Sequence, residues 1–137
     1  MRKRILYIGY FTFFLLILNY GCKKEEEELP PTISFKSGAT YTQDGDTVQV
    51  GHKLSFGIHA EGISEVITNF TVKKYLDDGT VITVMDTALY SETLDIDKIF
   101  YQNVEDKATW RFEVMDRNHM TAEASLVLYK DPNSAQT

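Results

Sequence analysis

The residues that could carry out catalysis are few and widely spaced. The chain has three histidines, His52, His59 and His119, and a single cysteine, Cys22. Histidine is the usual general acid or base, but it works beside a nucleophile or a metal ion. The sequence has no HExxH, CxxC or Gly-x-Ser-x-Gly motif and no glycine-rich phosphate loop. We therefore expect that the chain is not an enzyme. Of the three functional hypotheses that the sequence suggests, a small hydrolase that uses a histidine is the weakest.

Paired aspartates are the next candidates, because carboxylate oxygens are the ligands that calcium prefers. Three such groups occur, Asp44-Gly45-Asp46, Asp77-Asp78 and Asp95-Ile96-Asp97. None matches the twelve-residue calcium loop of helix-loop-helix proteins. Aspartate is also common in β-turns. We predict no resident metal or cofactor, and calcium binding stays open as an alternative.

Cys22 ends a segment with the composition of a secretory signal. Three basic residues (2–4) precede an uncharged apolar run from Ile5 to Leu18, and small residues come before the cysteine. A helix over 5–21 would be about 26 Å long at about 1.5 Å per residue. A bilayer core is about 30 Å thick, so this helix is marginal as a membrane span. We predict a signal segment over 1–21, with an uncleaved anchor helix as the alternative.

The Gly21-Cys22 pair, placed directly after the apolar run, resembles the lipidation site of bacterial lipoproteins. The motif prefers leucine three residues before the cysteine, where this chain has Asn19, with Leu18 one position earlier. This looser form is common in Bacteroidota lipoproteins. The resemblance implies cleavage before Cys22, acylation of Cys22 by palmitate-type chains, and an anchor in the outer membrane. Two or more acyl chains are sufficient for stable membrane attachment.

Residues 22–31 are predicted to form a linker. They contain Lys23-Lys24, four glutamates over 25–28, and Leu29-Pro30-Pro31. Like charges repel one another and prolines favour an extended chain, so the segment is typical of a solvated spacer. The acidic run also resembles the surface-export signal of Bacteroidota lipoproteins, which implies display on the cell surface. The two interpretations are compatible.

The charge of the mature chain argues against nucleic acid as a partner. The chain has 14 basic and 20 acidic residues, and three of the basic ones lie in the signal segment. Residues 22–137 therefore carry 11 basic and 20 acidic residues, a net charge of −9. Nucleic-acid binding requires clustered lysine and arginine. The membrane is instead the expected partner, through the lipid on Cys22.

From Thr32 onward the hydrophobic pattern is that of β-strands. Apolar and polar residues alternate over 54–60, 108–114 and 122–128, which gives each strand one buried face. Shorter strands are predicted over 32–35, 47–50, 69–75, 80–85 and 93–96. Turns are predicted at Asp77-Asp78-Gly79 and over 116–119. The sequence thus predicts an all-β antiparallel sandwich of seven to eight strands over 32–131, followed by a flexible tail over 132–137.

The segment from Trp110 to Asn118, followed by Ala122 and Leu126, resembles the last hairpin of immunoglobulin-like domains of bacterial surface proteins. The pattern is aromatic-x-aromatic-x-Val-x-Asp, then a turn and a final strand. The cysteine pair and the strand-C tryptophan of antibody domains are absent from the sequence. The resemblance therefore implies the broad fold, and a fold does not determine a function.

Two further features bear on surface contacts. The segments Asp46-Thr47-Val48 and Asp86-Thr87-Ala88 resemble the Asp-Thr-aliphatic sites at which Bacteroidota attach O-glycans, so Thr47 and Thr87 are candidate glycosylation sites. Four tyrosines fall outside the inward register and are candidate contact residues, or else pack beneath loops: Tyr75, Tyr90, Tyr101 and Tyr129.

These features together predict a lipid-anchored binding or adhesion module of the cell envelope, with an unidentified protein or glycan ligand. The alternative is an accessory structural subunit of a larger outer-membrane complex, which could pair with its partner through an edge strand.

Overall fold

The computed structural model describes residues 26–101 and 107–134, and within these ranges the secondary structure is β-strand. Neither range contains a helix long and apolar enough to cross a membrane. Cys22 and the predicted signal segment lie outside the described residues. The eight strands are β1 (Thr32–Phe35), β2 (Thr47–Val48), β3 (Lys53–Glu61), β4 (Ile67–Leu76), β5 (Val81–Ser91), β6 (Thr93–Tyr101), β7 (Lys107–Asp116) and β8 (Thr121–Lys130).

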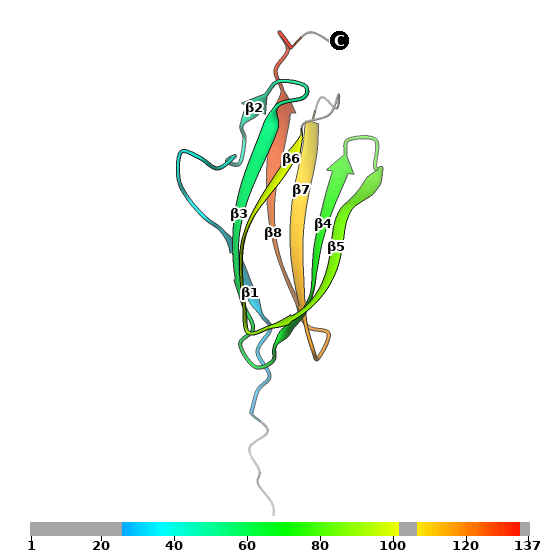
Figure 1. Ribbon diagram of the computed structural model, residues 1–137. Helices are drawn as coiled ribbons and strands as arrows, with labels where there is room; N and C mark the ends of the chain where they lie inside the picture. The colour runs from blue at the N-terminus through cyan, green and yellow to red at the C-terminus, as the bar shows by residue number, and fades with distance from the viewer. Residues whose placement is uncertain (1–25, 102–106, 135–137) are drawn as a thin grey trace, which may run out of the picture.

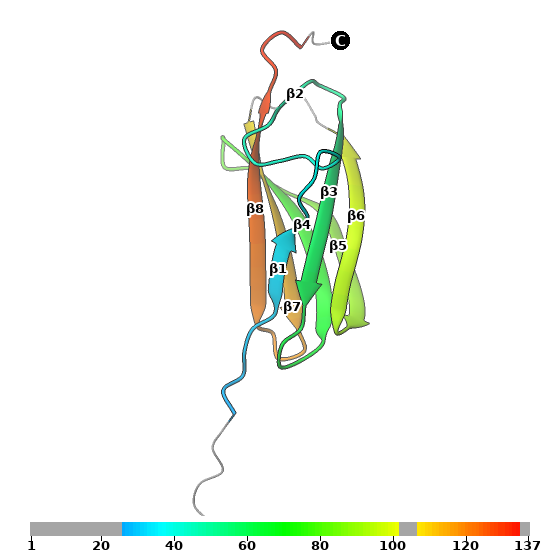
Figure 2. The ribbon, with the colours of Figure 1, turned by 90° about the vertical axis from the view of Figure 1, so that its left-hand side faces the viewer.

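The strands form a sandwich of two unequal sheets (Figures 1 and 2). The three-stranded sheet has the order β1-β3-β6, and the five-stranded sheet has the order β2-β8-β7-β4-β5. Neighbouring strands are antiparallel except for β2, which runs parallel to β8. The first two strands are thus divided between the sheets: β1 belongs to the three-stranded sheet and β2 to the five-stranded sheet. The predicted all-β, immunoglobulin-like sandwich of seven to eight strands is confirmed.

Alternating side chains from both sheets fill the core. The apolar residues that the sequence placed inward on 54–60 and 108–114 are all buried. On β8, Leu126 and Leu128 are buried, whereas Ala122 and Ala124 are only half-buried. Trp110 and Phe112 from β7 pack on Phe56 from β3, with ring centroids 5.4 Å and 5.1 Å apart. These aromatic contacts join the two sheets, and no disulfide is needed for a core of this size.

The ends of several predicted strands differ from the structure, most of all on β5 and β6. The strand expected over 47–50 ends at Val48, because the backbone NH of Val50 donates to Ser134 Oγ, at 2.8 Å, instead of to a ladder. The strands expected over 80–85 and 93–96 extend to Ser91 and Tyr101. Both strands lie at the edges of their sheets, where half-exposed side chains weaken the alternation that sequence reasoning relies on.

Both predicted turns are present. Gly79 has φ of 85°, a conformation that glycine adopts without strain, and the backbone NH of Thr80 donates to Asp78 Oδ1 at 2.8 Å. In the turn between β7 and β8, the buried Asp116 accepts from the backbone NH groups of Asn118 and Met120, each at 2.9 Å. His119 takes up the positive φ of 64° that this turn requires.

The two ends of the sandwich differ in what they carry (Figure 1). The N-terminal segment arrives at the lower end, where Leu29 NH donates to Ser64 Oγ at 2.8 Å. The long connection over 36–52 rises from the middle of the sandwich to its upper end, where the β4–β5 turn and the C-terminal residues also lie. Residues 132–134 contact this end through the Ser134 hydroxyl. The bounds predicted for the signal, linker and tail remain predictions.

Candidate functional site

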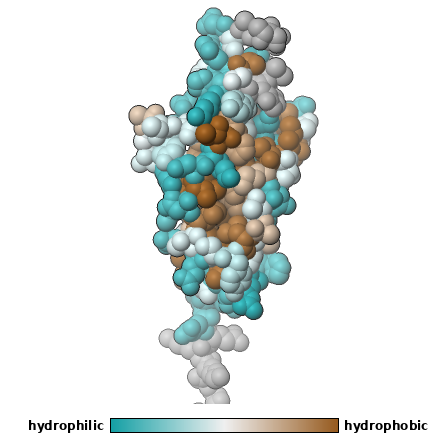
Figure 3. Space-filling model, viewed as in Figure 1, coloured by the Kyte–Doolittle hydropathy of each residue, from teal (hydrophilic) through white to brown (hydrophobic). Residues whose placement is uncertain are grey.

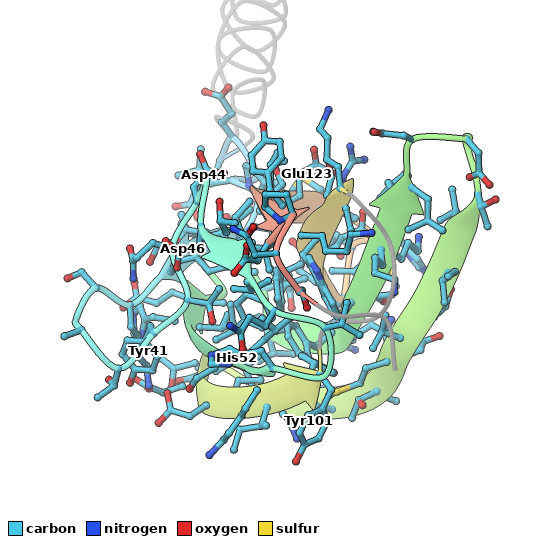
Figure 4. The ribbon with its side chains drawn as sticks, turned by 90° about the horizontal axis from the view of Figure 1, so that it is seen from above. Tyr41, Asp44, Asp46, His52, Tyr101 and Glu123 are labelled. Atoms are coloured by element: carbon cyan, nitrogen blue, oxygen red, sulfur yellow. The ribbon has the colours of Figure 1, made fainter. Side chains whose placement is uncertain are left out.

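The upper end of the sandwich is built by the connection between β1 and β3, which Figure 4 shows from above. Asp44 Oδ1 accepts from the backbone NH of Val127 at 2.7 Å, and Asp46 Oδ2 accepts from the NH of Gln43 at 2.8 Å. The Asp46 carbonyl accepts from Tyr129 NH at 2.9 Å. The two carboxylates therefore attach the connection to β8 and close its turn. Because each accepts an internal hydrogen bond, their spacing is explained by the fold.

A row of charged side chains covers the outer face of the three-stranded sheet. Cross-strand pairing sets His59 on β3 opposite Asp95 on β6, and Gly57 opposite Asp97. His59 Nδ1 lies 3.2 Å from Asp95 Oδ2, and His59 Nε2 lies 3.2 Å from Glu61 Oε1. Lys36, which follows β1, forms ion pairs with Asp95 and Asp97. We call Lys36, Tyr41, His59, Glu61, Asp95 and Asp97 the outer-face cluster.

Tyr41 fastens the upper connection onto this cluster. Its hydroxyl donates to Asp97 Oδ1 at 3.0 Å, and its ring lies against Gly57. A Cβ at Gly57 would be 2.7 Å from ring carbons of Tyr41, which is too close for any side chain. Glycine at this position therefore creates the space in which the ring lies on the sheet.

The pKa values within the outer-face cluster move in the directions that mutual pairing requires. Hydrogen bonds to Asp95 and then to Glu61 raise the pKa of His59, because both carboxylates favour the imidazolium form. Hydrogen bonds from Lys36 and His59 lower the pKa of Asp95. Donation to Asp97 raises the pKa of the Tyr41 hydroxyl. The cluster is an exposed network of paired charges that holds a loop in place.

The structure does not bring the three histidines together. His52 lies in the upper connection, His59 on the outer sheet face and His119 in the lower β7–β8 turn. Within residues 26–101 and 107–134, no three histidine, cysteine, aspartate or glutamate side chains are arranged to hold a metal ion. All three acidic groups considered for calcium are engaged internally: Asp44 and Asp46 by backbone NH groups, Asp78 by Thr80, and Asp95 and Asp97 by Lys36.

Both candidate glycosylation residues are accessible. Thr47 is exposed on β2 and Thr87 is exposed on the edge strand β5. Beside Thr87, Asp86 Oδ1 accepts from Asn69 Nδ2 at 2.8 Å and from the Thr71 hydroxyl at 3.3 Å. The aspartate of this Asp-Thr-Ala segment therefore supports packing against β4. Accessibility is required for modification, and glycosylation of these two threonines remains a prediction.

The four candidate contact tyrosines differ in how they are covered. The Arg111 guanidinium stacks over Tyr75, with 4.6 Å between its central carbon and the ring centroid, and also pairs with Glu123. Tyr90 and Tyr101 are 72% and 63% exposed, whereas Tyr129 is 43% exposed. The ring of Tyr75 is therefore covered by a neighbouring side chain, and Tyr90 and Tyr101 are the more accessible surface aromatics.

Two structural features are not evident from the sequence. Lys36 and Tyr41 each make contacts across more than fifty residues of sequence. Hollows are also present at the lower end, one of about 430 Å³ between the acidic linker and the β3–β4 loop, lined by Glu26–Glu28, Ile63–Glu65 and Asn118. Alternation of aspartate with apolar residues on β6 was the one available signal for the cluster.

Comparisons with known proteins find the fold and no family. No family model matches the chain, and no curated protein matches its sequence. Two structures of the superoxide reductase (neelaredoxin) from Ignicoccus hospitalis are similar. The T24K form has a TM-score of 0.53 at 7% identity, over 79% of this chain and 87% of that one. The other has a TM-score of 0.50 at 8% identity, over 75% and 81%.

More distant matches are a CARDB domain from Pyrococcus furiosus (TM-score 0.44, 16% identity, 75% and 94% covered) and a conjugate transposon protein from Bacteroides vulgatus (TM-score 0.43, 11% identity, 85% and 97% covered). These last two scores are too low to support any argument. At 7–8% identity the superoxide reductase likeness concerns the fold alone and provides no evidence of an enzyme. The chain is an all-β protein with an immunoglobulin-like sandwich.

Proposed function

We propose that this chain is a binding module of the cell envelope, anchored in the outer membrane by acyl chains on Cys22. The observation that carries the proposal is that different segments of the chain lie at the two ends of the sandwich. The N-terminal segment meets the domain at its lower end, and the connection over 36–52 rises to the opposite end. A lipid on Cys22 would thus hold the lower end toward the membrane and leave the upper end pointing away.

The reach of the linker agrees with this arrangement. Leu29, whose NH is bonded to Ser64, follows Cys22 by seven residues. An extended chain spans about 3.5 Å per residue, so the domain would stand up to about 25 Å from the anchored cysteine. The glutamates over 26–28 line the lower end, and they would be repelled by anionic lipid headgroups. Both features favour a domain held away from the bilayer.

The surface presented by such a domain suits recognition better than catalysis. The upper connection is ordered by backbone hydrogen bonds that Asp44 and Asp46 accept and by the one that Tyr41 donates, so a ligand would meet a preformed surface. Tyr101 at this end is exposed, and tyrosine is enriched in contact surfaces. The ligand class that we propose is a protein or a glycan. Outward display on the cell surface is part of the same proposal.

A second candidate function, an accessory subunit of a larger envelope complex, is favoured by the edges of the two sheets. β5 and β6 each pair on one side only within the described residues. An edge strand offers backbone NH and C=O groups to a strand of another chain. Stable co-purification of the full-length chain with other envelope proteins would favour this candidate over a module with an external ligand.

The anchor is tested by metabolic labelling with an alkyne-bearing fatty acid in a Bacteroidota host. The full-length chain should give a labelled product of mature size, whereas Cys22→Ser should remain unlabelled and uncleaved. Tyr20→Phe is the matched control, because it alters the same segment and leaves Gly21-Cys22 intact. A labelled, mature-sized product from Cys22→Ser would refute the anchor.

A further inference from the structure

One side of the sandwich is left open between β5 and β6. Phe100 of β6 packs on Trp110 of β7, two strands away from β5 in the five-stranded sheet, and the upper part of β5 stands clear of β6 in Figure 1. Apolar side chains border the opening from both sheets and are only half-buried against the core: Val84, Met85 and Leu89 from β5, and Leu94, Ile96 and Phe100 from β6. Figure 3 shows apolar surface gathered on the face that carries β6 and β5 in Figure 1. We call this region the side opening.

The edge of β6 is regular enough to serve as a template for another strand. Its nine residues pair with β3 without any shift in register, and their exposure alternates along the whole strand. The pairing of β5 with β4, in contrast, contains two shifts in register. Such irregularities twist an edge and hinder further pairing. The β6 edge is therefore the better site for strand addition.

Lys98 gives the side opening a specific charge. It pairs in register with Phe56, which is fully buried, and cross-strand partners lie on the same face of a sheet. The lysine stem thus begins on the core face of β6, between the apolar Ile96 and Phe100. Within 26–101 and 107–134, no hydrogen bond or ion pair engages its ammonium group. A cation among half-buried apolar side chains favours an anion on an incoming strand.

We propose that the side opening binds an extended segment of a partner protein, which adds beside β6 as a fourth strand of the three-stranded sheet. The segment would have apolar residues on its inward face and an aspartate or glutamate opposite Lys98. This inference names a second recognition surface, and it rests on the proposed function only in taking the chain to be a binding module.

The same charges argue against a second copy of this chain that pairs over most of the length of β6. If two β6 strands paired antiparallel about Asp97 or about Lys98, identical charges would face each other. If they paired about Ile96, each Asp95 would face an Asp97. Like charges directly opposite one another destabilise a strand pair. An inward lysine on an edge strand also discourages pairing between copies of the same chain. Selection between partners often combines repulsion of one with attraction of another.

The test uses three synthetic nine-residue peptides in which threonine alternates with valine, and in which the central inward residue is glutamate, threonine or lysine. The full-length chain in detergent micelles is titrated with each peptide and followed by the backbone amide signals of β6. We expect the glutamate peptide to shift these signals and to bind about 3- to 5-fold more tightly than the threonine peptide, which is the gain from one accessible ion pair. The lysine peptide should bind most weakly.

A charge reversal decides between this inference and nonspecific apolar binding. Lys98→Glu should invert the order, so that the lysine peptide binds best. Lys73→Glu is the matched control, because it makes the same charge change on the outward face of the other sheet and should keep the original order. Both variants must retain the melting temperature of the wild type within a few degrees.

Absence of binding at millimolar peptide, shifts confined to β5, or an unchanged order in Lys98→Glu would each overturn the inference. The titration does not depend on acylation. Its failure would therefore leave the anchor at Cys22 untouched, and failure of the fatty-acid labelling would leave the side opening untouched.

Discussion

At the scale of single residues, this protein uses charged side chains to position loops. Asp44, Asp46 and Asp116 each accept backbone hydrogen bonds that close a connection. His59 and Lys36 neutralise the aspartates of β6 on the outer sheet face. Charged hydrogen bonds of this kind are the stronger ones, and they act locally. The acidic composition of the chain is thus partly a consequence of how its turns and loops are held.

The outer-face cluster makes folding stability depend on pH through His59. Because the pKa of His59 is raised in the folded protein, its protonated form adds stability that is fully present below its unfolded value of about 6.5. This contribution is lost as the pH rises through the raised folded pKa. We predict that His59→Asn lowers the melting temperature of the full-length chain more at about pH 5.5 than at about pH 9.

The partner of His59 can be identified by a second substitution. Asp95→Asn should lower the pKa of His59 in an NMR titration, because the amide no longer favours the imidazolium. An unchanged pKa of His59 in Asp95→Asn, together with equal melting-temperature losses at both pH values, would show that the cluster does not act as described.

At the scale of strands, the register of β7 decides which side chains build the core. Ala108, Trp110, Phe112 and Val114 face inward, and a slip by one residue would expose all four. Trp110 is 2% exposed and packs on Phe56 and Phe100 across the two sheets. The inward register that the alternation predicted for this strand is confirmed by the burial of these residues.

We predict that Trp110→Ala lowers the free energy of unfolding by about 3–5 kcal/mol, because it leaves a cavity between the sheets. Thr109→Ala, on the opposite face of the same strand, should cost about 1 kcal/mol or less. Urea denaturation of the full-length chain and both variants measures the difference. Equal losses in the two variants would contradict the register.

The sequence is informative about strands where alternation is strict and both sheets cover the strand. It therefore predicted the inward faces of β3 and β7 and the turn at Gly79. It did not predict the lengths of β5 and β6, because a half-exposed edge strand tolerates exposed apolar residues such as Ile82 and Ile99. It also could not predict the contacts of Lys36 and Tyr41, which depend on how the connection folds back over the sheet.

At the scale of the whole molecule, we propose that the two ends of the sandwich have different tasks. The lower end receives the chain from the proposed lipid anchor, and the upper end carries the connection over 36–52. The side opening between β5 and β6 lies between these ends, and it would remain accessible to a partner when the domain is tethered. A domain anchored as we propose would thus be held at one end and would leave both proposed recognition surfaces exposed.

The most direct test of this account is protease shaving of intact cells of a Bacteroidota host that express the full-length chain, with antibody detection of the domain before and after treatment. Display of the domain outside the cell predicts that the signal disappears from intact cells, while a periplasmic marker survives. Survival of the domain until the envelope is broken would contradict outward display, and it would favour the accessory subunit within the envelope.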